Sequence, residues 1–308
     1  MIELKKSPVV FDYENHTYHL GDRELQGITS TLIRRAFPDK YKDVDPEVLA
    51  NAARKGHELH TAIEFYENIG DDKGEDRIKL YAKLKDDYKL TTLATEYLVS
   101  DEEHYASSID LVLQNINGYL YLADIKTTYN LDKASTGLQL SIYKRLFELQ
   151  NPGVKVDAIF AIWLPNRDHT IADFVQLSVV DDETIDELIK ADLADKPYEY
   201  PAIPDDWYIW ENMYNAAVDM KAMAEQHIEK AKEKMRETML KANLSCVKTA
   251  SCTVSYIPAR KTKRFDSATF KKENTDLYNS YMKETDTAEQ VRVIQKKPKE
   301  VEQKDSKK

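Results

Sequence analysis

Three short apolar runs, each bounded by polar or turn residues, lie in the middle of the chain at residues 94–99, 107–113 and 119–127. Runs of this length, rich in β-branched and aromatic residues, are typical of β-strands. The dipeptide Asn117-Gly118, between the last two runs, is of the kind that closes a tight hairpin. The pattern therefore predicts three consecutive strands, the last two of them paired antiparallel.

Helical patterns flank these strands. We expect one helix to begin at Asp45-Pro46 and to turn a set of small and apolar residues inward, namely Leu49, Ala52, Ala53, Gly56, Leu59, His60 and Ile63. Further helices are expected at residues 75–90 and 134–149, and strands at 158–164 and 174–179. An N-terminal hairpin (residues 9–20) and a short helix ending at Phe37 come first. Strands, a helix and a return to strands predict the α/β class, with a mixed central β-sheet flanked by helices.

The C-terminal third differs from the rest of the chain in its pattern of apolar and charged residues. Residues 206–243 predict one long, charge-rich helix, whose heptad pattern is too irregular to choose between packing on the core and forming a homo-oligomer. A small basic element at residues 244–295 is expected to hold a strand (251–257) and a helix (266–282). The Lys/Glu-rich residues 296–308 predict a disordered tail. The core domain is therefore assigned to residues 1–205, with helical and basic extensions after it.

Charge and composition narrow the function only slightly. The net charge of −10 argues against a protein that coats nucleic acid, although residues 244–308 carry 15 Lys and Arg against 9 Asp and Glu. Such a distribution suits an enzyme that gathers metal ions and touches phosphate in places, and it equally suits an acidic domain with a solvated tail. The sequence has no run of about 18 apolar residues and no apolar signal region, so we expect a cytoplasmic protein with no membrane span.

The strongest chemical signal is the acid-x-Lys triplet Asp124-Ile125-Lys126. In a strand, Asp124 and Lys126 share one face while Ile125 points the other way, into the core. Asp110 lies on the preceding predicted strand, where antiparallel pairing would bring it close to Asp124. Two carboxylates can hold Mg²⁺, and a nearby lysine can stabilise the transition state of phosphodiester hydrolysis. A surface salt bridge between Asp124 and Lys126 is the simpler alternative.

Two further features are weak when taken alone. His60 lies on the apolar face of its predicted helix, four residues after Gly56, where a histidine is more often a hydrogen-bonded core residue. Gln139 and Tyr143 lie one turn apart on the helix after the triplet, a pair that amphipathic helices also produce by chance. The order in which these residues follow one another along the chain makes both features more informative.

The ordered set of Gly56-x-x-x-His60, an Ile-Asp-Leu-Val strand, the acid-x-Lys triplet and Gln139-x-x-x-Tyr143 resembles the RecB-type branch of the PD-(D/E)XK nucleases. The resemblance implies a restriction-endonuclease-like core that binds Mg²⁺, with Mn²⁺ as a substitute. It implies a metal site made by His60, Asp110, Asp124 and the Ile125 carbonyl. The catalytic residues would be Lys126, Asp124 and Asp110, with Glu96 matching a glutamate often found on the strand before the aspartate. Gln139 and Tyr143 would contact DNA.

The N-terminal hairpin resembles that of phage and organellar members of this branch, and the segment from Val254 to Tyr281 resembles the end of YqaJ-like phage recombination exonucleases. This resemblance implies an exonuclease that resects linear double-stranded DNA in the host cytoplasm for a single-strand annealing protein. Related nucleases hold an iron–sulfur cluster on four cysteines, so with 2 cysteines this chain should lack one. A basic group is a further candidate for DNA contact and comprises Arg260, Lys261, Lys263 and Arg264. A structure-specific or single-strand nuclease, and a non-catalytic DNA-binding or assembly module, remain as alternatives.

Overall fold

The computed structural model describes residues 2–13, 15–204, 206–259 and 265–283. Its chain contacts define two compact units, Met1–Glu225 and Gln226–Lys308. The boundary lies inside the long helix α6 (Trp207–Lys241), which matches the helix expected at residues 206–243.

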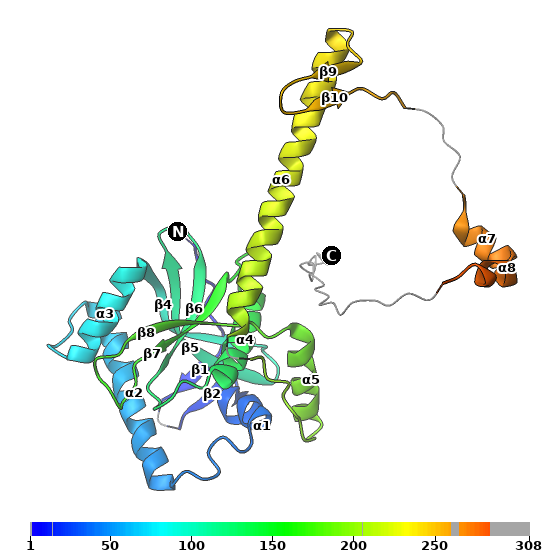
Figure 1. Cartoon of the computed structure of the whole chain (residues 1–308). Helices are drawn as coiled ribbons and strands as arrows, with labels where there is room; N and C mark the ends of the chain where they lie inside the picture. The colour runs from blue at the N-terminus through cyan, green and yellow to red at the C-terminus, as the bar shows by residue number, and fades with distance from the viewer. Residues whose placement is uncertain (1, 14, 205, 260–264, 284–308) are drawn as a thin grey trace, which may run out of the picture. The chain divides into compact units, whose positions relative to one another are not determined.

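The first unit is built on an 8-stranded sheet with the order β1-β2-β3-β5-β6-β7-β8, in which β4 also pairs with β5 (Figure 1). Strands β3 and β5 are parallel, as are β6 and β7, and the other neighbours are antiparallel. The fold is therefore mixed α/β, as predicted. The strands are β1 (Val10–Asp12), β2 (Thr17–Leu20), β3 (Arg23–Gly27), β4 (Leu90–Ser100), β5 (Tyr105–Asn115), β6 (Leu120–Lys126), β7 (Ala158–Trp163) and β8 (Asp173–Leu177).

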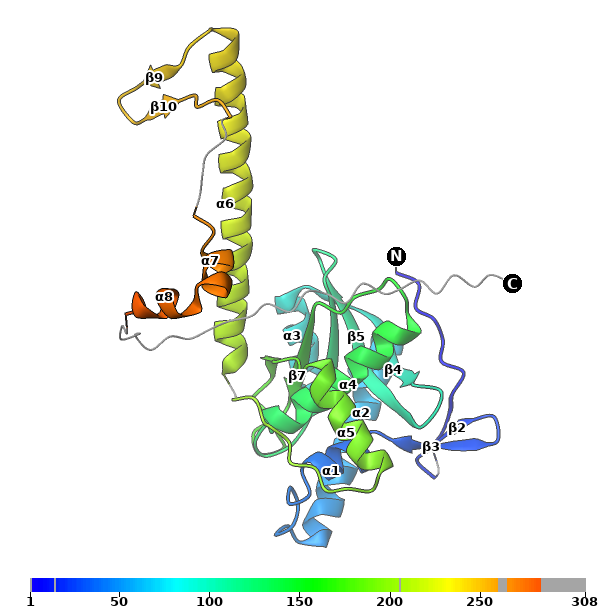
Figure 2. The ribbon, with the colours of Figure 1, turned by 90° about the vertical axis from the view of Figure 1, so that its right-hand side faces the viewer.

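Helices cover both faces of this sheet. Helices α2 (Pro46–Ile69) and α3 (Asp76–Tyr88) lie on one side, and α4 (Lys133–Gln150) and α5 (Asp182–Leu193) on the other (Figures 1 and 2). A short π-helical turn, η1 (Thr29–Ile33), continues into α1 (Arg34–Ala36) on the α4 side. Because both faces are covered, the central strand β6 is buried along almost its whole length. Any charged group on β6 must therefore find partners inside the protein.

Local signals explain where α2 begins and ends. The Asp45 side chain caps the helix by accepting a hydrogen bond from the Glu47 N–H, and Pro46 occupies the first turn. Gly70 ends the helix in the left-handed conformation, with φ of 80°. The predicted inward face is correct only in its second half. Leu59 and Ile63 are buried, whereas Ala52 and Ala53 are exposed, because the first turns of α2 extend beyond the sheet (Figure 1).

Several elements differ from the sequence-based expectation. Strand β3, helix α5 and strand β9 (Cys246–Lys248) were not predicted. The single helix expected at residues 266–282 is two short helices, α7 (Ser267–Glu273) and α8 (Thr275–Ser280), separated at Asn274. The other predicted helices and strands are present with shifted ends.

The second unit contains the end of α6, followed by a two-stranded hairpin. Strand β9 pairs antiparallel with β10 (Thr253–Ser255), and α7 and α8 come later in the chain. Asp266 caps α7 by accepting from the Thr269 N–H. The basic candidates Arg260, Lys261, Lys263 and Arg264, and the tail at 296–308, lie outside the described residues. Within the described ranges, no helix is both long and apolar enough to cross a membrane.

Candidate active site

The pairing of β5 with β6 brings the predicted carboxylates to one part of the sheet. Leu111 is the register partner of Ala123 in this antiparallel pair, so Asp110 and Asp124 lie at the next position along each strand. At this position the Ile125 N–H donates to the Asp110 side chain, at 2.7 Å from Oδ2. The carboxylate takes the place of a backbone carbonyl as the partner of this N–H. The Asp110 carboxylate is therefore fixed directly to the acid-x-Lys strand.

A local distortion turns Glu96 toward the same point. Glu96 lies opposite Asp110 in the β4–β5 pair and has φ of 45°, in the left-handed region that a non-glycine residue rarely adopts. On β5, Ile109 and Val112 both belong to the core cluster on the α4 side, although residues three apart on a regular strand face opposite ways. Both strands therefore depart from regular alternation at these two acids, which is typical of functional sites.

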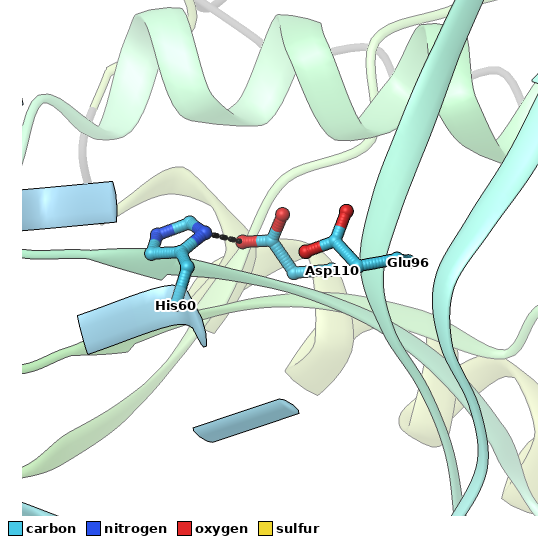
Figure 3. Close-up of side chains that lie close together, drawn as sticks. All are labelled: His60, Glu96 and Asp110. Carbon is cyan, nitrogen blue, oxygen red and sulfur yellow. Dashed lines mark ion pairs between the residues drawn. The ribbon is translucent and has the colours of Figure 1, made fainter. Parts of the chain in front are cut away.

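His60, Glu96 and Asp110 form a compact group on the α2 side of the sheet. One ligand-type atom from each residue lies within 4.8 Å of the others, and Figure 3 shows Asp110 between the imidazole and Glu96. His60 Nδ1 lies 3.5 Å from Asp110 Oδ2, and His60 Nε2 lies 2.9 Å from the Ile125 carbonyl oxygen. Glu96 Oε2 accepts a hydrogen bond from Ser108 Oγ at 2.6 Å. A histidine, two carboxylates and a backbone carbonyl therefore converge.

Asp124 and Lys126 form a second group, on the α4 side of β6. Lys126 Nζ lies 2.5 Å from Asp124 Oδ2. Gln139 Nε2 donates to Asp124 Oδ1 at 2.7 Å, and Gln139 Oε1 accepts from Lys126 Nζ at 3.2 Å. Gln139 Nε2 also donates to the Tyr143 hydroxyl at 2.9 Å, and that hydroxyl accepts from Ser107 Oγ at 2.8 Å. The acid and the lysine are thus held in place by α4.

Helix α2 approaches the end of β6 closely, which places His60 beside Ile125. A Cβ added at Gly56 would meet Thr127 Oγ1 at 3.3 Å, tighter than an ordinary van der Waals contact. His60 follows Gly56 by four residues, one turn along the same helix face. The glycine therefore permits the approach that brings the imidazole to the Ile125 carbonyl.

The electrostatics of the first group favour a cation. Burial raises the pKa of Asp110 to about 7 from the usual 3.8; the charge of His60 lowers it, and Asp124 and Glu96 raise it further. On α2, burial and the charge of Glu96 also raise the pKa of Glu64. Several carboxylates share one poorly solvated region, so a bound cation would relieve their repulsion.

Lys126 remains protonated in this environment. Burial lowers the pKa of its ammonium, but the charges of Asp124 and Asp110 and the contact with Asp124 raise it by more, so the pKa lies above its usual range. Burial and the Asp124 charge likewise raise the pKa of Tyr143, so its hydroxyl keeps its proton. The site thus presents a fixed positive charge at Lys126 next to a cluster of acids.

The donor atoms of His60, Glu96 and Asp110 could hold a metal ion. Adjacent ligands of Mg²⁺ lie about 3 Å apart and opposite ligands about 4.2 Å apart. His60 Nε2 and Ile125 O lie 2.9 Å apart in hydrogen-bond contact, and the ligand-type atoms of His60, Glu96 and Asp110 lie within 4.8 Å of one another. In addition, Asp124 Oδ2 is buried, and no described residue directs a well-formed hydrogen bond to it. The charge of Asp124 Oδ2 is balanced by the Lys126 ammonium 2.5 Å away.

A cavity of about 680 Å³ opens beside the second group. Lys126, Thr128 and Gln139 line one side of it, and Arg34 and Tyr41 line another. This cavity connects the candidate catalytic lysine with solvent on a side that carries further positive charge.

The structure brings together most of the predicted site. His60, Asp110, Glu96 and the Ile125 backbone lie in one group, while Asp124 lies in the adjoining group and is not within the 4.8 Å cluster. Gln139 lines the cavity. The Tyr143 hydroxyl, however, is buried and bonded within the protein. A direct DNA contact by Gln139 or Tyr143 stays a prediction.

Three residues near the site were not predicted from the sequence. Glu64 follows His60 by four residues on the same helix, a spacing that could have suggested it. Ser108 supports Glu96, and Ser107 supports Tyr143. Nothing in the sequence around these serines distinguishes them from ordinary strand residues.

Comparison with known proteins adds little. No protein-family model matches the sequence. No curated protein matches it either. The solved structure titled "Crystal structure of SSO0001" is similar at 18% identity over 59% of this chain and 81% of that chain, with a TM-score of 0.35. A likeness at that score carries no argument, so the function must be argued from the site itself.

Proposed function

We propose that this chain is a Mg²⁺- or Mn²⁺-dependent deoxyribonuclease of the RecB-type branch of the PD-(D/E)XK nucleases. One observation carries the proposal: a histidine–carboxylate group (His60, Asp110, Glu96) adjoins a buried Asp124–Lys126 ion pair across strand β6. Hydrolysis of a phosphodiester needs both a site for a divalent ion and a fixed positive charge near the phosphate.

Each part of the site has a defined task in this proposal. His60, Glu96, Asp110 and the Ile125 carbonyl would hold the ion, with Asp124 from the adjoining group as the further ligand that the resemblance implies; when bound, the ion supplies charge neutralisation and a lowered pKa for the attacking water. Lys126 keeps its proton and stabilises the negative charge that grows on the phosphate. Asp124 and Gln139 orient the Lys126 ammonium through the contacts at 2.5 and 3.2 Å. Glu96 adds negative charge beside Asp110.

The finer parts of the proposal come from the resemblance of the sequence. They are exonuclease action on linear double-stranded DNA in phage-type recombination, a single-strand annealing protein as partner, and a place in the host cytoplasm. The cavity beside Lys126 supports access of a substrate strand to the lysine. It does not distinguish duplex from single-stranded substrate, so circular DNA is the necessary comparison.

The test is cleavage of end-labelled linear duplex and of closed circular DNA, with MgCl₂, with MnCl₂ and with EDTA. We expect metal-dependent loss of the linear duplex only, and a fall of about 10²- to 10³-fold in rate for Asp110→Asn and Lys126→Ala. Asp76→Asn is the control, because Asp76 is 91% exposed on α3 and pairs with Lys79 at the surface. The nuclease proposal fails if wild type cleaves nothing with either metal or if both site variants match it.

Metal binding can be followed separately from cleavage. Mn²⁺ should raise the melting temperature of wild type, because a ligand that binds only the folded state stabilises it. The shift should disappear in Asp110→Asn and His60→Ala and persist in Asp76→Asn. A shift that is unchanged in both site variants would place the ion elsewhere.

A further inference from the structure

A cation stacked on two aromatic rings lies where the two central parallel strands end. Arg167 Cζ is 4.8 Å from the ring centroid of Tyr129 and 5.4 Å from that of Trp163. Tyr129 follows β6, and Arg167 follows β7. Because Lys126 and Trp163 are register partners in these strands, the group adjoins the candidate catalytic lysine.

The backbone that carries these side chains is firmly held. The Asn166 N–H donates to the Thr127 carbonyl at 3.0 Å, and the Trp163 indole N–H donates to the Thr128 carbonyl at 3.0 Å. The Arg77 guanidinium donates to Asn166 Oδ1 at 2.9 Å. Two segments distant in the sequence are thus joined into one rigid surface.

Arg167 forms no close ion pair with the acid beside it, although its charge, after the hydrogen bonds from Thr170, helps to lower the pKa of Asp168. Across the described ranges, no carboxylate oxygen forms an ion pair with its guanidinium within 4.0 Å. The neighbouring acid, Asp168, turns to Thr170, whose N–H and hydroxyl donate to Asp168 Oδ1 at 2.9 and 2.6 Å. Arg167 is exposed, so its guanidinium is open to an anionic ligand.

Stacking leaves the binding atoms of Arg167 free. Aromatic rings contact the flat face of a guanidinium, while its N–H donors point outward in the plane, in the fork that matches two phosphate oxygens. Tyr129 is 67% exposed, so part of its ring can take a nucleic-acid base. The chemistry that fits both features is a polynucleotide strand.

We propose that Tyr129, Trp163 and Arg167 form a strand-binding platform that holds a backbone phosphate of DNA beside the bond to be cleaved. Thr128 links the platform to the lysine, because its carbonyl anchors Trp163 and the residue lines the same cavity as Lys126. The choice of DNA rests on the proposed nuclease function. The test does not depend on cleavage.

The test measures binding of fluorescein-labelled (dT)20 by anisotropy in EDTA, from 50 to 200 mM NaCl. Loss of one phosphate contact lowers the slope of log Kd against log salt by about 0.7 for a single strand. We expect Arg167→Gln to show this smaller slope and about five- to tenfold weaker binding at 50 mM NaCl. Arg167→Lys keeps the charge and should lose less affinity, and Tyr129→Ala should weaken binding about fivefold without changing the slope.

The matched control is Arg54→Gln, which removes the same charge from an exposed arginine of α2 that pairs with Glu58. It should bind as wild type does. The platform is wrong if wild type does not bind (dT)20, or if folded Arg167→Gln and Tyr129→Ala keep its affinity and salt slope. Binding that depends on Arg167 in a protein that never cleaves DNA would support the platform and overturn the nuclease. Metal-dependent cleavage with unchanged binding in the platform variants would support the nuclease and overturn the platform.

Discussion

Gln139 Nε2 on α4 lies 2.7 Å from Asp124 Oδ1 on β6, and the carbonyl oxygen of the same amide accepts from Lys126 at 3.2 Å. One glutamine therefore contacts both charged residues of the acid-x-Lys triplet. An amide suits this position, because it offers a donor to the carboxylate and an acceptor to the ammonium at once.

Replacing Gln139 should impair catalysis more than folding. Partners that orient catalytic or metal-binding groups are worth about 10- to 100-fold in activity, so we expect Gln139→Ala to lower kcat by that factor. Gln150→Ala is the matched control. Gln150 is also a buried glutamine of α4, and it donates to Lys5 O and Tyr97 Oη rather than to Asp124 or Lys126. Both variants should lose about 1–3 kcal/mol of stability, measured by urea unfolding. Equal losses of activity in the two would contradict the role given to Gln139.

The Tyr143→Phe variant distinguishes a structural role of Tyr143, which holds Gln139 in place, from a direct contact with DNA. The Tyr143 hydroxyl is bonded to Ser107 and Gln139 inside the protein, so its removal should cost about 1 kcal/mol of stability and leave DNA affinity in EDTA unchanged. A modest fall in kcat should follow from a less well held Gln139. Anisotropy and urea unfolding on the same protein check both parts. A clear loss of affinity with unchanged stability would favour the direct contact that the sequence suggested.

Asp110 should make stability depend on pH when no metal is present. Because its pKa in the folded protein is raised to about 7, its protonation stabilises the folded state fully below about pH 4. That contribution is lost as the pH rises through 7. In EDTA, the melting temperature of wild type relative to Asp110→Asn should therefore fall between pH 4 and pH 8. A difference that stays flat with pH would show that Asp110 is not buried as described.

The stabilisation of the folded protein by Mn²⁺ should increase over the pH range in which the contribution of the Asp110 proton decreases. A bound cation must displace the Asp110 proton, so metal affinity should rise with pH by up to about tenfold per unit below pH 7. The Mn²⁺-induced rise in melting temperature should grow accordingly in wild type.

Gly56 tests the approach of α2 to β6. Alanine in a helix interior is favoured over glycine by about 1 kcal/mol, whereas its Cβ would lie 3.3 Å from Thr127 Oγ1. The two effects oppose each other, so Gly56→Ala should unfold within about 1 kcal/mol of wild type. The displaced helix should hold His60 less well against Ile125 and weaken Mn²⁺ binding about tenfold. Thr127→Ala removes the clashing oxygen, so the double variant Gly56→Ala/Thr127→Ala should bind Mn²⁺ as wild type does. No change in Mn²⁺ affinity in Gly56→Ala would contradict this packing argument.

The sequence predicts the parts of the site that follow from simple periodicity. Asp124 and Lys126 share a face because strands repeat every two residues, and His60 follows Gly56 by one helical turn. Glu96 joins Asp110 through a left-handed backbone that no local sequence feature marks, since glutamate rarely adopts it. The sequence therefore does not predict that His60, Glu96 and Asp110 meet, because their meeting depends on the distortion in β4 and β5.

The two missed elements of the first unit have different explanations. Strand β3 carries a single buried apolar residue, Leu25, so its apolar pattern is weak; it forms a local hairpin with β2 and pairs with Tyr105 and Ala106 far along the chain. Helix α5 did have local signals. Asp181 caps it, and Ile185 and Leu188 are spaced for one buried face.

A buried ion pair between α2 and α3 should control stability without touching the site. Glu67 and Lys85 have side chains 6% and 14% exposed and lie 2.5 Å apart, and Tyr81 and Thr92 complete their hydrogen bonds. Lys85→Met would leave Glu67 buried without its cation, which costs about 3–5 kcal/mol. Combining it with Glu67→Gln should recover most of that loss. Lys83→Met, which breaks an exposed pair with Asp87 on the same helix, should cost less than about 1 kcal/mol. Urea unfolding of wild type and the three variants measures this, and a Lys85→Met protein as stable as wild type would mean that Glu67 is solvated.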